Sequence, residues 1–398
     1  MHGMERSDKE RIEELLARGV EEVIDRASLE RKLKIGKPLR VKLGIDPTSP
    51  NLHLGRSVPL LKLRDFQELG HTVVLIIGDF TGTIGDTSDK DSERPMLSGE
   101  EVKRNMETYI AQAGKIIDIK KTEVVRNSTW LGKLGYGDIG RHADVFALSD
   151  FVARENIRKR LDAGKRVSLR ELLYPLMQGY DSVEVKADVE IGGTDQRFNL
   201  LAGRDLQRAY GQEPQDIMMG PIIEGLDGRK MSSSYGNTVN LLDAPNDMFG
   251  KIMSLRDESI IRYFIILTRM PMEVVRAYEM DLARGGNPRD IKARLAHEIV
   301  RMYHGEKEAD AAQDYFARTF TAKEIPDAMP EFVPKKGARD VVSVLVDSGL
   351  VPSKSEARRA IGQKGVKIDG ATVEDVHQEV ARGSVLQKGK IKFVRIAG

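Results

Sequence analysis

The sequence predicts an α/β fold built on a parallel sheet, followed by a helical region and a small α+β region. Two observations carry this prediction. Between residues 39 and 80, the patterns of a strand, a helix and a second strand follow one another, which is the order of a right-handed parallel unit. After residue 243 the apolar residues take helical spacing, and from Lys335 onward the chain is basic and mixes helical and strand patterns.

The elements of the first block follow from their local patterns. Strands are predicted at 39–45, 72–80, 182–193 and 216–223. Helices are predicted at 52–69 and 195–211, and residues 8–35 are expected to form one or two amphipathic helices. Gly70 closes the helix at 52–69 in the position that favours a left-handed cap. The continuous apolar run at 72–80 is typical of a strand that is buried on both faces.

The later elements are marked by their end signals. Asp243 and Pro245 indicate a helix start, and residues 289–305 have clean helical spacing that ends at Gly305. Residues 328–337 read as a linker that contains Pro. Beyond it we expect two helices and a strand, a hairpin closed by Asp369 and Gly370, and a last strand at 386–396.

Composition excludes several classes of function. The chain contains no Cys, which excludes disulfides, thiolate nucleophiles and Cys-based zinc sites. We found no His spacing typical of a metal site, no apolar run of membrane-spanning length, and no secretory signal in the charged first residues. A cytoplasmic setting is therefore expected. Residues 335–398 hold 13 Lys and Arg against 7 Asp and Glu, which suggests a polyanion partner, although a solvated surface explains the same charge.

The segment DPTSPNLHLGRS, residues 46–57, is the first candidate for chemistry. It follows a predicted strand and opens a predicted helix, where backbone N–H groups attract phosphate. Gly55 would let a flat base approach closely, and His53 and Arg56 share a helix face. Arg56 opposes the helix dipole, and a nearby anion would resolve that conflict. A solvated helix start explains this stretch equally well.

The segment DGRKMSSSYGN, residues 227–237, is the second candidate. Its glycines, cations and serines make a mobile loop that suits anions, although an ordinary linker has the same composition. Taken together, HLGR at 53–56 and KMSSS at 230–234 resemble the HIGH and KMSKS signatures of class I aminoacyl-tRNA synthetases. GIDPT, GDFTGTIGDTSDKDSER, LLYPLMQGYDSV and VEIGGTDQRFNLLAGR are similar to segments of the bacterial tyrosyl-tRNA synthetases, and the tail resembles the S4 RNA-binding domain.

The resemblance covers nearly the whole chain and implies a domain plan and a reaction. It implies a Rossmann-like catalytic domain at 1–224 with a dimer-forming insertion at about 110–165. An α-helical anticodon-binding domain with the ATP loop would follow at 225–330, and an S4-like domain at 335–398. The enzyme would form tyrosyl-adenylate from L-tyrosine and ATP with Mg²⁺, and would transfer the tyrosyl group to tRNA(Tyr). The implied partner is a second copy of the chain, with no membrane and no tightly bound cofactor.

The resemblance also assigns roles to residues. The catalytic residues would be Thr48, His53, Lys90, Arg94 and Lys230. ATP would contact Asp46, His53, Gly55, Arg56, Gly193, Asp195, Lys230, Met231 and Ser232. Tyrosine would contact Gly44, Asp86, Tyr174, Gln178, Asp181 and Gln196. RNA would contact Lys354, Arg358, Arg359, Lys364 and Lys367. Asp181 would accept from the phenol; rejection of phenylalanine through such an acceptor is established for tyrosyl-tRNA synthetases as a group.

The sequence departs from the family pattern at three positions, and it allows several alternative functions. Arg56 replaces the usual second His of the first signature, Ser233 replaces the central Lys of the second, and Lys42 stands where many members have Tyr. We hypothesise that Arg56 partly supplies the charge that Ser233 lacks. The alternatives are a catalytically weakened paralogue that binds RNA, a tryptophan enzyme, and a ligase without tRNA. Asp86 and Asp181 could instead be caps.

The apolar residues of segment 125–165 also allow two interpretations. Trp130, Leu131 and Phe146 could form a dimer interface between the halves of the α/β domain, or they could belong to its core. Tyr174 on an apolar helix face could also be a core residue, and Lys90 and Arg94 lie in a run of alternating charges that would suit a solvated loop.

Overall fold

The computed structural model describes residues 8–88, 96–321, 329–334, 340–389 and 392–397. The chain divides into two compact units, Met1–Ala309 and Asp310–Gly398. Among the described residues, no helix is both long enough and apolar enough to span a membrane.

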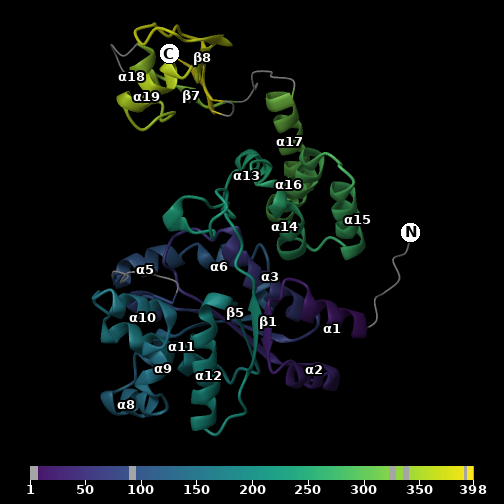
Figure 1. Cartoon of the computed structure of the whole chain (residues 1–398), viewed down its shortest axis with the longest axis vertical. Coiled ribbons are helices and arrows are strands. Elements are labelled where there is room, and N and C mark those ends of the chain that lie inside the picture. Colours follow the sequence, from purple (N-terminus) through teal and green to yellow (C-terminus); the bar gives the residue numbers. More distant parts are fainter. Residues whose placement is uncertain (1–7, 89–95, 322–328, 335–339, 390–391, 398) are drawn as a thin grey trace. The chain divides into compact units, whose positions relative to one another are not determined.

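A six-stranded sheet forms the centre of the large unit, in the order β1-β6-β5-β2-β3-β4 (Figure 1). Its strands are β1 (Glu22–Ile24), β2 (Arg40–Ile45), β3 (Thr72–Ile77), β4 (Thr122–Arg126), β5 (Val189–Gly193) and β6 (Asp216–Gly220). The pairs from β6 to β4 are all parallel, and β1 adds an antiparallel edge. The predicted parallel α/β architecture is therefore confirmed.

Helices surround this sheet. They are α1 (Asp8–Ala17), α2 (Arg26–Ile35), α3 (Leu54–Glu68), α4 (Thr81–Ile84), α5 (Gly99–Met106), α6 (Tyr109–Ala113), α7 (Ser128–Leu131), α8 (Tyr136–Asp144), α9 (Leu148–Val152), α10 (Glu155–Asp162), α11 (Leu169–Val185) and α12 (Arg197–Ala209). Short turns of 3-10 helix lie at Ile119–Lys121, Thr194–Gln196, Ser233–Tyr235 and Asp257–Ser259. α3 packs on β2, β3 and β5, while α11 packs along α12 and reaches β2.

Two predictions in this block need correction. The strand predicted at 182–193 is wrong in its first part, because Ser182–Val185 form the last turn of α11 and β5 begins only at Val189. A capping box of Ser168 and Glu171 starts α11, and Lys186, with φ of 49°, ends it. An alternation of four residues is too short to separate a strand from a helix end. In addition, the segment 8–35 contains β1 between its two helices.

The region after the sheet is helical, as the sequence predicts. It consists of α13 (Pro245–Met253), α14 (Ile260–Leu267), α15 (Met272–Ala283), α16 (Pro288–His304) and α17 (Glu306–Phe316), with a π-helical turn at Ala317–Thr321. Pro245 is the first residue of α13, and Gly305 caps α16. Both predicted end signals are therefore confirmed.

The small unit has its own sheet, in the order β7-β11-β10-β8-β9. Its elements are β7 (Glu331–Phe332), α18 (Val341–Asp347), α19 (Lys354–Gly362), β8 (Val366–Ile368), β9 (Ala371–Thr372), β10 (Val385–Lys388) and β11 (Lys392–Ile396). Asp369 and Gly370, with φ of 49° and 85°, form the predicted turn between β8 and β9. The single strand predicted at 386–396 is wrong, because β10 and β11 are separate antiparallel strands. Gly389, with φ of 64°, follows β10 and lets the chain turn.

Candidate active site

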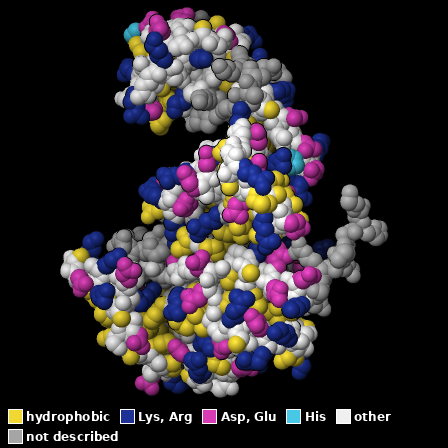
Figure 2. Space-filling model, turned by 45° about the vertical axis from the view of Figure 1, so that its right-hand side comes forward, with side chains coloured by type: hydrophobic (Ala, Val, Ile, Leu, Met, Phe, Trp, Pro, Cys, Tyr) yellow, Lys and Arg dark blue, Asp and Glu magenta, His cyan; other side chains and the backbone are white. Residues whose placement is uncertain are grey.

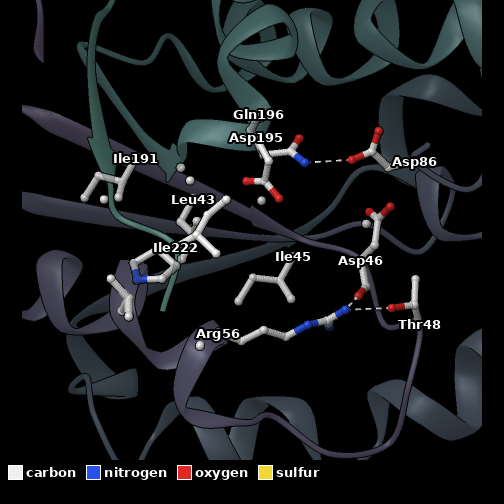
Figure 3. Close-up of a pocket in the computed structure, with 18 of the residues that line it drawn as sticks. Leu43, Ile45, Asp46, Thr48, Arg56, Asp86, Ile191, Asp195, Gln196 and Ile222 are labelled. Carbon is white, nitrogen blue, oxygen red and sulfur yellow. Dashed lines mark hydrogen bonds between the residues drawn. The ribbon is translucent and has the colours of Figure 1, made fainter. Parts of the chain in front are cut away.

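One pocket of about 320 Å³ lies at the carboxyl ends of β2, β5 and β6 (Figure 3). Such a position is where open parallel sheets bind ligands. The pocket brings together sixteen of the residues that the sequence analysis singles out: Gly44, Asp46, Thr48, His53, Gly55, Arg56, Asp86, Tyr174, Gln178, Asp181, Gly193, Asp195, Gln196, Lys230, Met231 and Ser232. Ser233 also lines it. Lys90 and Arg94 lie outside the described residues.

Asp46 is the first polar side chain beyond β2. Its carboxylate accepts hydrogen bonds from the Tyr174 hydroxyl and the Thr81 hydroxyl, each at 2.7 Å. Burial raises the pKa of Asp46 to about 6, although both hydrogen bonds oppose that rise. Gly78 is required beside it, because a Cβ there would lie 2.0 Å from the Asp46 Oδ1 atom. Sequence reasoning missed Gly78, and the available signal was a Gly that interrupts the apolar run of the strand predicted at 72–80.

His53 caps the start of α3 without a side-chain capping bond. The ring is buried at 7% exposure, and its Nδ1 atom has no hydrogen-bond partner among the described residues. Burial, helped by the nearby positive charges of Arg56 and Lys230, lowers the pKa of His53 to about 3. The imidazole is therefore neutral at pH 7. A Cβ at Gly55 would lie 3.0 Å from this ring, so the Gly keeps the ring in its place.

Arg56 binds the loop that precedes its own helix. Its guanidinium donates to the Thr48 hydroxyl at 2.7 Å and to the Asp46 backbone carbonyl at 3.2 Å (Figure 3). It also donates to the Tyr109 hydroxyl at 2.9 Å. The guanidinium of Arg56, whose charge opposes the helix dipole, is therefore bound by oxygens of the protein itself. Arg56 still lines the pocket, and its contacts fix the backbone between Asp46 and Thr48.

Asp86 and Gln196 meet across the pocket from opposite sides. The Gln196 amide donates to the Asp86 carboxylate at 2.7 Å (Figure 3). The other Asp86 oxygen accepts from the Ser88 backbone N–H at 3.0 Å and from the Ser88 hydroxyl at 2.6 Å. Asp86 therefore has the local capping role of a loop Asp and also presents a carboxylate to the pocket.

Asp181 lies on α11, where its buried side chain lines the pocket. It accepts from the Trp130 indole N–H at 2.8 Å and from the Asn127 amide at 3.2 Å. Burial raises the pKa of Asp181 to about 7, and the charge of Lys42 is the largest influence that opposes this rise. Sequence reasoning missed Asn127. Of the two interpretations given for Trp130, an interface or the core, the structure supports the core: the ring packs on the apolar core, and its N–H donates to Asp181.

Lys230 connects the loop that contains KMSSS to the sheet. Its ammonium group lies 2.8 Å from the Asp195 carboxylate, which follows β5. The loop is braced by Asn237, which accepts from the Ser232 backbone N–H at 2.9 Å and donates to Asp227 at 2.6 Å. The two candidate ATP residues Lys230 and Asp195 therefore form an ion pair in this structure.

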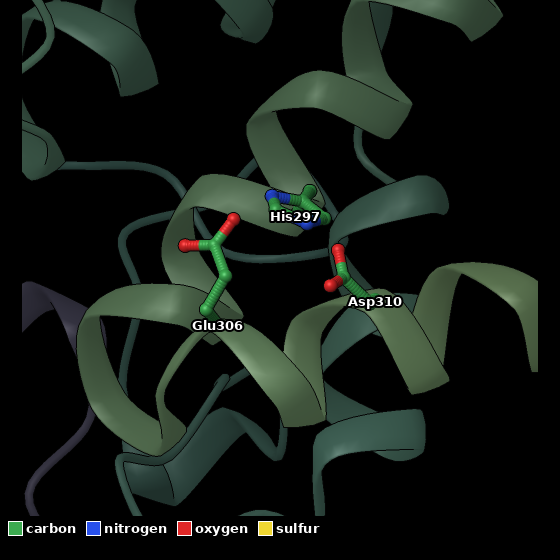
Figure 4. Close-up of side chains that lie close together, drawn as sticks. All are labelled: His297, Glu306 and Asp310. Carbon is green, nitrogen blue, oxygen red and sulfur yellow. The ribbon is translucent and has the colours of Figure 1, made fainter.

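The described residues contain one group with metal-ligand geometry. His297 on α16 and Glu306 and Asp310 on α17 offer ligand atoms within 4.8 Å of one another (Figure 4). Both carboxylates are exposed, and Arg301 lies 3.8 Å from Glu306 and provides a counter-charge. Exposed acidic groups with such a neighbour do not indicate a metal site.

The five candidate RNA residues all lie in the small unit. Lys354, Arg358 and Arg359 are exposed on α19, Lys364 is exposed in the turn after it, and Lys367 is half-buried on β8. Arg359 pairs with Glu356 at 2.5 Å, and Lys364 lies 3.6 Å from Glu374. Figure 2 shows Lys and Arg side chains along the edge of this unit.

Comparisons with known proteins show which family the chain resembles over its whole length. Residues 34–321 match the family described as tRNA synthetases class I (W and Y), and residues 321–396 match the C-terminal domain described as tyrosine–tRNA ligase SYY-like. The chain is 47% identical to the tyrosine–tRNA ligase of Mannheimia succiniciproducens, over 96% of this chain and 97% of that protein. It is 48% identical to that of Thermotoga maritima, over 96% of each.

Solved structures show the same fold at lower identity. A truncated mitochondrial tyrosyl-tRNA synthetase of Coccidioides posadasii has a TM-score of 0.64 at 23% identity, over 78% of this chain and 92% of that one. The tyrosyl-tRNA synthetase of Archaeoglobus fulgidus, solved with L-tyrosine, has a TM-score of 0.62 at 22% identity, over 77% of this chain and 100% of that one.

Proposed function

The chain belongs to the class I tRNA synthetases of the tryptophan and tyrosine family, and we propose how its residues carry out the reaction. It activates L-tyrosine with ATP and transfers the tyrosyl group to tRNA. Relatives at 47% and 48% identity over 96% of the chain carry this activity in their names, and no finding favours the RNA-binding alternative. The observation that carries the assignment of residues is that sixteen candidate residues from distant segments line one pocket.

The first step joins the tyrosine carboxylate to the α-phosphate of ATP and releases pyrophosphate. This step needs positioning and charge rather than an enzyme nucleophile. We assign the substrate ammonium to Asp86, Tyr174 and Gln178, and the phenol to Asp181. The Asp181 carboxylate is fixed in place because it accepts hydrogen bonds from Trp130 and Asn127. A fixed acceptor in turn favours one position for the phenol.

The phosphates meet the residues of the two signatures. Because the pKa of His53 is about 3, the neutral ring can donate a hydrogen bond to a phosphate oxygen without titrating near pH 7. Thr48 is held by Arg56 beside this position. Lys230 would exchange its partner, from Asp195 in this structure to phosphate when ATP is bound, and Asp195 would then face the ribose. Lys90 and Arg94 remain candidates for the pyrophosphate side.

Mg²⁺ is proposed as the counter-ion that ATP brings, and not as a resident ion. Four carboxylates of the pocket are engaged by protein groups in the described structure. Asp46 accepts from hydroxyls, Asp86 accepts from an amide and a hydroxyl, and Asp181 accepts from an indole and an amide. Asp195 is paired with Lys230. This arrangement suits a metal that arrives with its substrate.

We further propose the domain roles, tRNA(Tyr) as acceptor and a homodimer in the cytoplasm, where tRNA is charged. The roles are a catalytic domain at 1–224, an anticodon-binding domain at 225–330 and an RNA-binding domain at 335–398. Support for the dimer comes from apolar side chains that are exposed in or beside the segment 110–165. Tyr136 is 95% exposed, Leu148 66% and Leu169 78%. Apolar side chains that gather on one exposed surface mark protein interfaces, so these three residues are the candidates for the dimer contact.

Amino-acid-dependent exchange of pyrophosphate into ATP tests the function. Exchange is expected with tyrosine, and at least a thousandfold less efficiently with phenylalanine or tryptophan. Charging of tRNA(Tyr) with labelled tyrosine tests the second step. Silence with all three amino acids would return the assignment to an RNA-binding protein, and exchange with tryptophan alone would move it to the other branch of the family.

A further inference from the structure

A buried ion pair lies directly behind the tyrosine side of the pocket. Lys42 on β2 and Glu190 on β5 are partners in adjacent parallel strands. Their charged groups are 3.1 Å apart, and each side chain is only 1% exposed. Neither residue lines the pocket. A buried ion pair contributes little more to the stability of the fold than a packed apolar pair would. Stability therefore does not explain why these two charged residues are buried here.

The pair makes its contacts with one turn of α11. The Lys42 ammonium donates to the Gln178 backbone carbonyl at 3.0 Å and to the Ser182 hydroxyl at 2.5 Å. Glu190 accepts from the Gln178 side-chain amide at 3.1 Å and from the Ser182 hydroxyl at 3.2 Å, and also from Gln215. Gln178 is thus held at both its backbone and its side chain.

The contact with Glu190 fixes which end of the Gln178 amide faces the pocket. A side-chain amide has an NH₂ end and an oxygen end of nearly equal shape, and only its hydrogen bonds decide between them. A carboxylate can only accept, so Glu190 binds the NH₂ end. The oxygen end is then the one left for the pocket, where an ammonium group needs an acceptor.

We propose that the Lys42–Glu190 pair is a positioning device for substrate recognition: it fixes the Gln178 amide so that its oxygen, and not its NH₂ group, faces the ammonium of the bound amino acid. This inference rests on the proposed function, since it takes Gln178 as a contact of the substrate ammonium. Lys42 provides the counter-charge beside the buried Glu190 carboxylate, and Glu190 orients the amide.

Two ligands separate this role from a general effect on the pocket. L-Tyrosine carries the ammonium, whereas 3-(4-hydroxyphenyl)propionate has the same phenol and carboxylate without it. In Lys42→Met/Glu190→Gln both charges are removed at nearly constant shape, and residue 190 can now present either end of an amide. We expect calorimetry to show that tyrosine binds about tenfold more weakly to this variant, which corresponds to roughly 1.4 kcal/mol. The propionate reports any change at the phenol, since the Lys42 charge also acts on Asp181, and its affinity should fall less than that of tyrosine.

Lys62→Met is the matched control. Lys62 is also a buried lysine, and it is paired with Asp65 at 3.0 Å. Its ammonium donates to the Leu15 backbone carbonyl in α1 instead of to α11. Like Lys42, it does not line the pocket. The Lys62→Met substitution should lower thermal stability without changing the ratio of the affinity for tyrosine to the affinity for the propionate. If Lys42→Met/Glu190→Gln does not fold by circular dichroism, Ser182→Ala removes one bond from each member of the pair and should lower the ratio about threefold.

Several results would overturn the proposal. These are an unchanged ratio in the folded variant, an equal loss for both ligands, or the same change in Lys62→Met. If the wild-type chain binds no tyrosine, the proposed function itself fails. If the wild type binds tyrosine and the folded variant keeps the wild-type ratio, only the positioning role fails.

Discussion

Replacing Arg56 by Met removes the guanidinium that ties the loop after β2 to α3. The side chain makes three hydrogen bonds, to the Thr48 hydroxyl at 2.7 Å, the Tyr109 hydroxyl at 2.9 Å and the Asp46 carbonyl at 3.2 Å. A hydrogen bond from a charged donor contributes about 1.5–3 kcal/mol when buried. Arg56 is only half-buried, and its acceptors can bind water in the variant. We therefore expect a total loss of about 2 kcal/mol.

This loss should appear mainly in the use of ATP, because the loop carries Thr48. About 2 kcal/mol corresponds to a roughly thirtyfold decrease in kcat/KM for ATP in tyrosine-dependent pyrophosphate exchange. The KM for tyrosine should change less. Arg64→Met is the matched control on the same helix, since Arg64 forms an exposed pair with Glu68 at 2.6 Å that is worth about 1 kcal/mol or less. A kcat/KM within twofold of wild type in folded Arg56→Met would refute the reasoning.

Three further predictions address other parts of the molecule. If Arg56 compensates for Ser233, exchange rates of Arg56→His, Ser233→Lys and the double variant should show a coupling energy of at least about 0.5 kcal/mol, and additive effects would contradict this. Because the pKa of Asp181 is about 7, protonation below that pH removes an acceptor for the phenol, so the KM for tyrosine should rise as the pH falls from 8 to 6. A flat profile would exclude Asp181 as that acceptor, and Asp181→Asn should remove the pH dependence. Deletion of 335–398 should leave tyrosyl-adenylate formation within about twofold and lower tRNA charging at least about tenfold at low salt and less at high salt, because salt weakens the contacts of the tail in the wild type, whereas equal charging would argue against an RNA-binding tail.

The local sequence predicted most elements of the fold because side-chain periodicity is a local property. The β-branched run at 72–80 contains β3, and the end signals at Pro245 and Gly305 match α13 and α16. The errors have local causes as well. Ser182–Val185 alternate like a strand but complete α11, and the run at 386–396 that looked continuous contains two strands, β10 and β11.

The candidate site shows a sharper division. Its residue types and signatures were readable from the sequence, and the described members line one pocket. The hydrogen-bond partners of these residues could not be predicted from the sequence, because they lie far apart in the chain. Gln196 donates to Asp86, and Trp130 donates to Asp181. No local pattern encodes such a pair, since its geometry depends on how helices dock on the sheet.

Arg56 and Lys42 show what the amino-acid sequence determined and what the tertiary structure decided. The sequence by itself determined that a cation stands at each position and that each departs from the family. Only the tertiary structure decided where the cations are directed. Arg56 turns back onto neutral oxygens of its own loop, and Lys42 meets Glu190 across two strands. The physical reason is that burial makes an unpaired charge costly, so packing of the sheet and helices selects its partner.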